Sequence, residues 1–201
     1  MKNLALLLAL ATTTIGFAQN NNDKIPVEPI EQSVFSIGVK GGFGHSFIVP
    51  YSNYDFMPSW NAGISAVYAP KQHWGIGLDV TYSGEGVKLK SGDYTNTTQL
   101  DYLRVPIKAI YFFRTYEEDF RPKISLAPTL GFMVNDHDNN GFKSTDFGGS
   151  LSLGFNYRLL RAVWLNVDAS YYQGVIDIYQ GNNENDLNGN VRLDLGVSFG
   201  F

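Results

Sequence analysis

Apolar residues alternate with small polar residues in eight segments between residues 33 and 201. In the last segment the odd positions from 191 to 201 are Val, Leu, Leu, Val, Phe and Phe, and the even positions between them are Arg, Asp, Gly, Ser and Gly. Successive side chains of a β-strand point to opposite faces, so each segment predicts a strand with one apolar and one polar face. The predicted strands are 33–43, 60–68, 74–83, 100–112, 122–133, 146–157, 162–172 and 190–201.

The connections between these segments are alternately long and short. Long polar stretches cover residues 44–59, 84–99, 134–145 and 173–189, whereas 69–73, 113–121 and 158–161 are shorter. Bacterial outer-membrane barrels have an even number of strands, long outer loops and short periplasmic turns. The pattern therefore predicts an all-β fold: an eight-stranded antiparallel up-and-down transmembrane β-barrel of the outer-membrane type, with both termini in the periplasm.

A soluble secreted barrel is the competing interpretation, because it would show the same alternation with its apolar face inside. The polar positions favour the membrane barrel. They are mostly Gly, Ser, Thr and Ala, whereas a face in water normally carries many Lys and Glu residues. The interior of an eight-stranded barrel has room only for side chains, so small residues with a few charges suit it.

The start of the chain predicts export. Residues 1–18 combine Lys2, an apolar run and a small-residue cleavage site, which is the pattern of a secretory signal peptide. Residues 19–32 form a polar periplasmic tether in this interpretation, and residues 33–201 form the barrel domain. Removing Lys2 leaves 14 basic and 19 acidic residues, a net charge of −5, which predicts no nucleic-acid partner. The chain has no cysteine, so no disulfide is expected.

Aromatic residues gather near the ends of the predicted strands, as expected for two membrane interfaces. The terminal Phe201 is the predicted signal for the barrel-assembly machinery, and outer-membrane lipid is the predicted surrounding. The candidate interface aromatics are Trp60, Tyr68, Trp74, Tyr82, Tyr111, Tyr171 and Phe199.

Seven charged residues fall on the predicted lumen face of five strands. Buried charges need partners, so we expect a mutually paired network. Such a network would act as a structural plug, and imperfect pairing along a wet path would instead give a narrow pore for ions or small solutes. The seven residues are Lys40, Asp79, Arg104, Lys108, Asp168, Arg192 and Asp194.

Two prolines, Pro106 and Pro128, fall inside predicted strands. Proline cannot donate a ladder hydrogen bond, and a closed barrel has no edge strand on which that donor would be unnecessary. We therefore expect a local bulge at each of them.

Other candidate chemistry is sparse. A lipid-modifying enzyme would need a nucleophile, a histidine and an acid near the outer rim, and only His45 and Ser46 with Glu85 or Asp55 offer that set. The acidic loop at 136–141 matches the first half of a calcium loop but lacks the bidentate Glu. We predict no enzyme and no cofactor, and the weak calcium candidates are Asp136, Asp138 and Asn140.

The loops and turns are the predicted contact surfaces. The long loops, of which the first is rich in aromatic residues, are expected to meet envelope or extracellular proteins or glycans. The turn at 114–121, with Glu117, Glu118 and Asp119, would be a docking surface if the protein served a secretion machine.

Four strings carry a resemblance to a known family. They are YLRVPIK at 102–108, RPKISLAP at 121–128, DFGG at 146–149 and LGF at 153–155. Together they resemble the PorT-like outer-membrane β-barrel family over nearly the whole mature chain. The resemblance implies a small closed barrel in a Gram-negative outer membrane, accounts for prolines in the middle strands and assigns no catalytic residue. The protein that gives this family its name is linked to a protein-secretion and gliding apparatus, so an accessory role in such an apparatus is an alternative function.

Overall fold

The computed structural model describes residues 34–200 except 50–53, 92–93, 138–140 and 181–185. The predicted signal peptide, the tether at 19–32 and Phe201 lie outside the described residues. Within the described part of the chain, no helix is long and apolar enough to cross a membrane.

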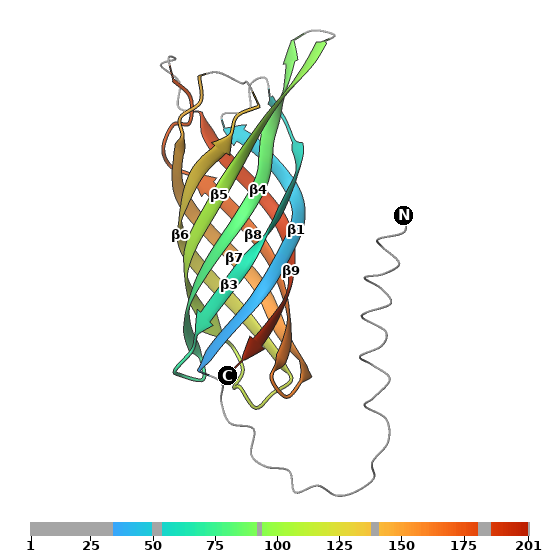
Figure 1. Cartoon of the computed structure of the whole chain (residues 1–201), viewed down its shortest axis with the longest axis vertical. Helices are drawn as coiled ribbons and strands as arrows, with labels where there is room; N and C mark the ends of the chain where they lie inside the picture. Colours follow the sequence, from blue (N-terminus) through green and yellow to red (C-terminus); the bar gives the residue numbers. More distant parts are fainter. Residues whose placement is uncertain (1–33, 50–53, 92–93, 138–140, 181–185, 201) are drawn as a thin grey trace, which may run out of the picture. The chain divides into compact units, whose positions relative to one another are not determined.

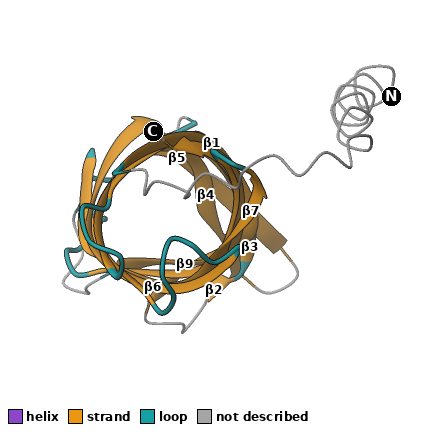
Figure 2. Cartoon of the chain, turned by 90° about the horizontal axis from the view of Figure 1, so that it is seen from below, coloured by secondary structure: helices purple, strands orange, loops and turns teal. Residues whose placement is uncertain are grey.

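The described residues form a closed antiparallel barrel (Figures 1 and 2). Closure comes from pairing of the first strand with the last and of β4 with β5. The very short β2 pairs only with β4, beside the start of β3. The strands are β1 (Phe35–Val49), β2 (Tyr54–Asp55), β3 (Met57–Tyr68), β4 (Trp74–Ser91), β5 (Tyr94–Phe112), β6 (Phe120–Asn135), β7 (Thr145–Leu160), β8 (Val163–Gly174) and β9 (Leu187–Gly200).

The side chains alternate between the two faces of the wall as the sequence predicts. Val39, Ile76 and Leu126 point outward and are more than 60% exposed, whereas Thr81 and Thr129 on the opposite face are buried. This arrangement puts the apolar face on the outside of the barrel. It confirms the predicted fold class and excludes the soluble barrel with an apolar interior.

Small residues let neighbouring strands approach closely on the lumen side. A Cβ added at Gly63 would overlap the backbone carbonyl oxygen of Val80, and one added at Gly154 would overlap that of Val167. Glycine is therefore required where the backbones of neighbouring strands approach this closely, which explains part of the small-residue pattern read from the sequence.

The barrel has two unlike ends. At the short-turn end lie the turns between β3 and β4, β5 and β6, and β7 and β8, together with the first and last strand residues, Phe35 and Gly200. At the long-loop end several strands run further than predicted, so the expected loop at 84–99 is wrong. The described residues of this range extend β4 and β5 into a paired hairpin end that projects beyond its neighbours (Figure 1). Threonine-rich strands such as 94–99 suit the pleated backbone although they lack an apolar face.

The bulges expected at the two prolines are also wrong. Pro106 pairs with Thr129 and Pro128 with Gly149, and the register is the same before and after both residues. Next to Pro106, the ladders that join β5 to β4 and to β6 lack a few residue pairs. The register shifts instead lie at Asp101/Tyr102 and at Arg158/Leu160.

The outward face generates a depth-dependent prediction. Leu126→Arg, in the middle of β6, should lower the free energy of unfolding in lipid vesicles by about 2–4 kcal/mol, because a charge would face hydrocarbon. Leu159→Arg, near the short-turn end, should cost only about 0–1 kcal/mol. Urea titration of the refolded protein measures both, and equal costs would contradict the membrane assignment of this face.

Candidate functional site

The lumen is occupied by side chains, beginning with Arg104 of β5. Its guanidinium group is 1% exposed and donates to Glu85 through Nη2 at 2.6 Å and Nε at 3.1 Å. Nη1 donates to Asp146 Oδ2 at 2.7 Å. One cation on β5 therefore joins carboxylates from β4 and β7 inside the lumen.

Neighbouring groups complete this arrangement, which we call the Arg104 cluster. Asn188 Nδ2 donates to Glu85 Oε2 at 2.9 Å, and Ser83 Oγ donates to Glu85 Oε1 at 2.8 Å. The rings of Tyr102 and Tyr172 lie with their centroids 4.3 and 4.4 Å from the guanidinium carbon, so the cation is held between two aromatic rings. Arg104, Glu85, Tyr102 and Asp146 are each at most 1% exposed, so the Arg104 cluster is a buried layer of the lumen.

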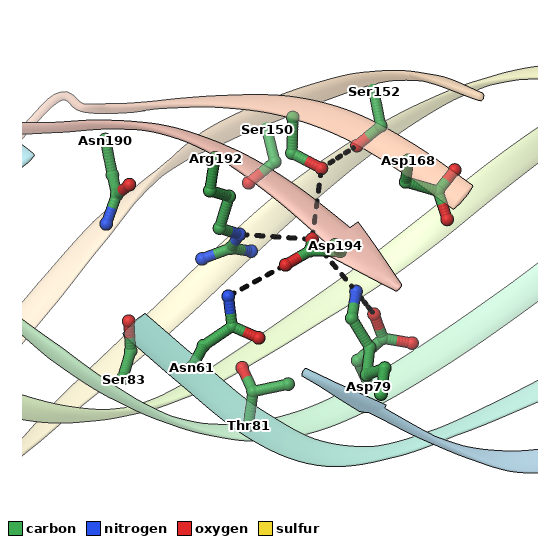
Figure 3. A network of polar contacts seen from close by, with 12 residues as sticks. Asn61, Asp79, Thr81, Ser83, Ser150, Ser152, Asp168, Asn190, Arg192 and Asp194 are labelled. Atoms are coloured by element: carbon green, nitrogen blue, oxygen red, sulfur yellow. Dashed lines mark hydrogen bonds and ion pairs between the residues drawn. The ribbon is translucent and has the colours of Figure 1, made fainter. Parts of the chain in front are cut away.

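A second network, which we call the Asp194 cluster, surrounds the Asp194 carboxylate inside the barrel (Figure 3). Lys40 lies between Asp79 and Asp194, at 3.1 and 3.3 Å, and Lys108 contacts Asp79 at 2.6 Å. Arg192 Nε donates to Asp194 at 3.3 Å. Two neutral donors also reach the Asp194 carboxylate, namely Asn61 Nδ2 at 2.8 Å and Ser170 Oγ at 3.3 Å.

Stacked arginine and aromatic side chains occupy much of the short-turn end. Tyr116, from the turn between β5 and β6, is buried beside Trp164. Arg158 stacks on both rings and donates to the Tyr116 carbonyl oxygen. Arg121 lies over Phe112 at 4.1 Å and donates to the Gln72 carbonyl oxygen at 2.8 Å.

The long-loop end is covered by a loop. Ile178, between β8 and β9, is fully buried against Ile48 and Val87. Phe142 of the β6–β7 loop packs on this apolar cluster and pairs with Tyr179 through an isolated β-bridge.

An ion pair joins the same two loops. Lys143 Nζ donates to Asp177 Oδ2 at 2.8 Å, and the backbone N–H of Tyr179 donates to the other carboxylate oxygen at 3.0 Å. The hydrogen bond from Lys143 holds the pKa of the Asp177 carboxyl below its usual value. The covering loop is therefore latched at neutral pH.

The cavities left in the lumen are small. One of about 70 Å³ lies toward the short-turn end, and one of about 20 Å³ lies beside the Asp194 cluster. A water molecule needs about 10–15 Å³ measured in this way, so the larger cavity has room for about five to seven waters. None of Arg104, Glu85 and Asp146 lines either cavity, so the Arg104 cluster separates both from the long-loop end.

The structure divides the seven predicted lumen charges among three places. Arg104 belongs to its own cluster, and Asp168 pairs with Lys123 at 3.0 Å. The other five meet in the Asp194 cluster: Lys40, Asp79, Lys108, Arg192 and Asp194.

Sequence reasoning missed five further lumen charges: Glu85, Asp146, Lys123, Arg121 and Arg158. Glu85, Arg121 and Arg158 lie in predicted loops, for which the sequence pattern indicates no inward or outward direction. Lys123 had a usable signal, because it alternates with the outward-facing Ile124.

The candidate enzyme set does not come together. His45 and Ser46 are neighbours on β1 and therefore point to opposite faces, with His45 exposed and Ser46 buried. Ser46 Oγ donates to the Gly86 carbonyl oxygen at 2.7 Å, and Glu85 is engaged by Arg104. The side chain of Asp55 lies outside the described residues.

The candidate calcium site cannot be assembled from the described residues, because Asp138 and Asn140 lie outside them. Asp136 lies just after β6. Among the described residues, no group of three or more His, Cys, Asp or Glu side chains is placed to hold a metal ion.

The predicted interface aromatics lie on the outer face of the wall, where most are well exposed. Tyr68, Trp74, Tyr111 and Phe199 lie toward the short-turn end, and Trp74 stacks edge-on against Tyr111 at 5.0 Å. The remaining three aromatic residues lie nearer the long-loop end: Trp60, Tyr82 and Tyr171.

Solved structures show the same fold. OprG from Pseudomonas aeruginosa superposes with a TM-score of 0.53 at 16% identity, covering 87% of this chain and 99% of that one. Neisserial surface protein A gives 0.51 at 20% identity, over 84% and 98% of the two chains. Outer membrane protein W of E. coli gives 0.51 at 13% identity, over 85% and 99%. Comparison with curated proteins gives no match.

Fold and lumen together define a transmembrane β-barrel whose interior is filled by paired side chains. A family model described as the outer membrane protein beta-barrel domain matches residues 17–180. The chain therefore belongs to the outer membrane protein beta-barrel domain family, which supports the predicted location in the outer membrane.

The Arg104 cluster predicts a large cost for removing its cation. Arg104→Met should lower the free energy of unfolding by about 3–5 kcal/mol, because Glu85 and Asp146 would remain buried without a counter-charge. The triple variant Arg104→Met, Glu85→Gln, Asp146→Asn should recover most of that loss. Arg114→Met, at an exposed ion pair, is the control and should change stability by about 0–1 kcal/mol in urea titrations. A triple variant as unstable as the single one would contradict this account.

The loop latch predicts a pH dependence. The lowered pKa of Asp177 means that its contribution is complete above the usual carboxyl range near 4 and is lost as pH falls through the folded-state pKa. Asp177→Asn should therefore speed backbone hydrogen exchange around Ile178 at pH 7. In this variant the protection of the loop should no longer depend on the protonation of residue 177 at low pH. Glu118→Gln at the short-turn end should leave that exchange unchanged, and equal rates in wild type and Asp177→Asn would refute the latch.

Proposed function

We propose that the protein is a closed, non-conducting outer-membrane barrel that acts as a structural and binding protein through its loop end. The observation that carries this proposal is the Arg104 cluster, in which a fully buried cation links two carboxylates inside the lumen. A second network and two covered ends add to that barrier.

A narrow ion or solute pore is the alternative, and it requires imperfectly paired charges along a continuous wet path. The described lumen carboxylates are not imperfectly paired, because each of them has a cation within 3.3 Å. They are Asp79, Glu85, Asp146, Asp168 and Asp194. Pairing of this kind favours the plug.

The long-loop end is the proposed binding surface. Its β4–β5 hairpin projects beyond the wall (Figure 1), and the latch between Lys143 and Asp177 fixes one loop against another. Val175 and Ile176, just after β8, remain exposed beside this latch. Exposed apolar groups on an ordered rim suit contact with a protein or glycan. In the proposed orientation this end faces outward, and the short-turn end and both termini face the periplasm.

The residues at the rim do not support an enzymatic role. His45 and Ser46 point to opposite faces of β1, and Glu85 forms an ion pair with Arg104. We accordingly propose a non-enzymatic protein.

A PorT-type accessory role in secretion ranks second, resting on the sequence resemblance. Its docking surface would be the turn between β5 and β6. Arg114 and Glu118 pair with each other there at 2.6 Å, Asp119 pairs with Arg158, and Tyr116 turns into the lumen. Glu117 is the remaining charged residue of this turn. Because the other charged residues are paired within the barrel, the contacts of this turn fit a structural role better than a docking role.

Planar-bilayer recording tests the proposal. The refolded wild type, shown to be inserted by its resistance to added protease, should give no steady unitary conductance. Arg114→Ala, on the exposed turn, should be equally silent. A steady wild-type conductance that changes in Arg104→Ala but not in Arg114→Ala would contradict the proposal and identify a pore through this layer.

A further inference from the structure

Buried charge in the barrel is distributed unevenly. The Arg104 cluster has one cation and two carboxylates, whereas the Asp194 cluster and the short-turn end together contain six cations and three carboxylates that face the lumen. The six cations are Lys40, Lys108, Lys123, Arg192, Arg121 and Arg158, and the three carboxylates are Asp79, Asp168 and Asp194. A fourth carboxylate, Asp119 near Arg158, is 69% exposed at the rim.

The cavity of about 70 Å³ lies within this cationic region. Four cations line it, Lys40, Lys108, Arg121 and Lys123, together with two carboxylates, Asp168 and Asp194. Its lining continues to Gly200, the last described residue, so the cavity reaches the short-turn rim. By the volume that a water molecule needs, it has room for about five to seven water-sized groups.

Arg121 is the cation of this lining that lacks a carboxylate partner among the described residues. It is 4% exposed, and its described contacts are the carbonyl oxygens of Gln72 and Arg114 and aromatic rings such as Phe112. A buried charge held only by carbonyl oxygens and ring faces is poorly compensated.

The neutral part of the lining can also hold a polar ligand. Ser36, Ser65 and Ser198 contribute hydroxyl groups, and Asn166 contributes an amide. Asn156 has a buried Oδ1 with no hydrogen-bond partner, and rotation of that amide presents its NH2 group instead. The cavity therefore offers donors as well as excess positive charge.

We propose that this cavity binds one small oxyanion, such as inorganic phosphate, between Arg121, Lys108 and Lys123. The anion offsets the excess positive charge, and the planar guanidinium group of Arg121 suits paired oxygen atoms. Phosphate has five non-hydrogen atoms and fits the volume. The site goes beyond the proposed role of the loop end and does not depend on it.

Thermal unfolding of the refolded full-length protein tests the site. The midpoint should rise by several degrees with millimolar phosphate, at ionic strength held constant with a bulky sulfonate buffer salt that the cavity cannot admit. Arg121→Gln should abolish that rise. Arg114→Gln, an exposed arginine on the adjoining turn, should retain it.

A second pair of variants keeps the test informative if Arg121→Gln folds poorly. Ser36→Asp places a carboxylate in the cavity, so it should raise the midpoint without phosphate and remove the phosphate response. Ser36→Asn introduces a side chain of nearly the same size as Asp but without charge, so the midpoint of this variant should still rise with phosphate. A wild type that responds no more to phosphate than to the sulfonate, or a Ser36→Asp variant that responds like Ser36→Asn, would overturn the proposal.

Discussion

Most charges inside this barrel are compensated by counter-charges on other strands, because eight strands enclose too little space for bulk water to solvate them. Arg104 shows the constraint most strongly. Its guanidinium group is buried, and the carboxylates that pair with it come from different strands, β4 and β7. The pairing is effective only if the wall closes in one register, since a shift by one residue would turn these side chains toward lipid.

The same constraint connects local sequence to global topology. Lys40 and Asp79 are 39 residues apart and Asn61 and Asp194 are 133 residues apart, yet these pairs meet in one network. Other contacts cover the two ends of the barrel: a latched apolar loop lies over one end, and stacked rings occupy much of the other. The internal space that remains is two small cavities, and the proposed binding role lies at the loop end.

Much of the fold could be predicted because alternation has an unambiguous physical meaning in a strand. It placed Leu126 outside and Asp79 inside. It failed where strands lack an apolar face, so Glu85 was assigned to a loop and the acid that holds Arg104 was missed. Pro106 was expected to form a bulge because sequence cannot show that a ladder can omit pairs without changing register. The partners of each charge depend on barrel closure, which no local pattern contains.

The central claim, that paired side chains seal the lumen, is tested most directly by thiol accessibility, for which the cysteine-free chain is suited. Thr81→Cys places a thiol on the lumen wall, where Thr81 is 1% exposed, and Phe113→Cys places one on the exposed short turn. With a small charged thiol reagent on both sides of the membrane, we predict rapid labelling at 113 and none at 81. Comparable labelling at both positions would show an open lumen and contradict the account.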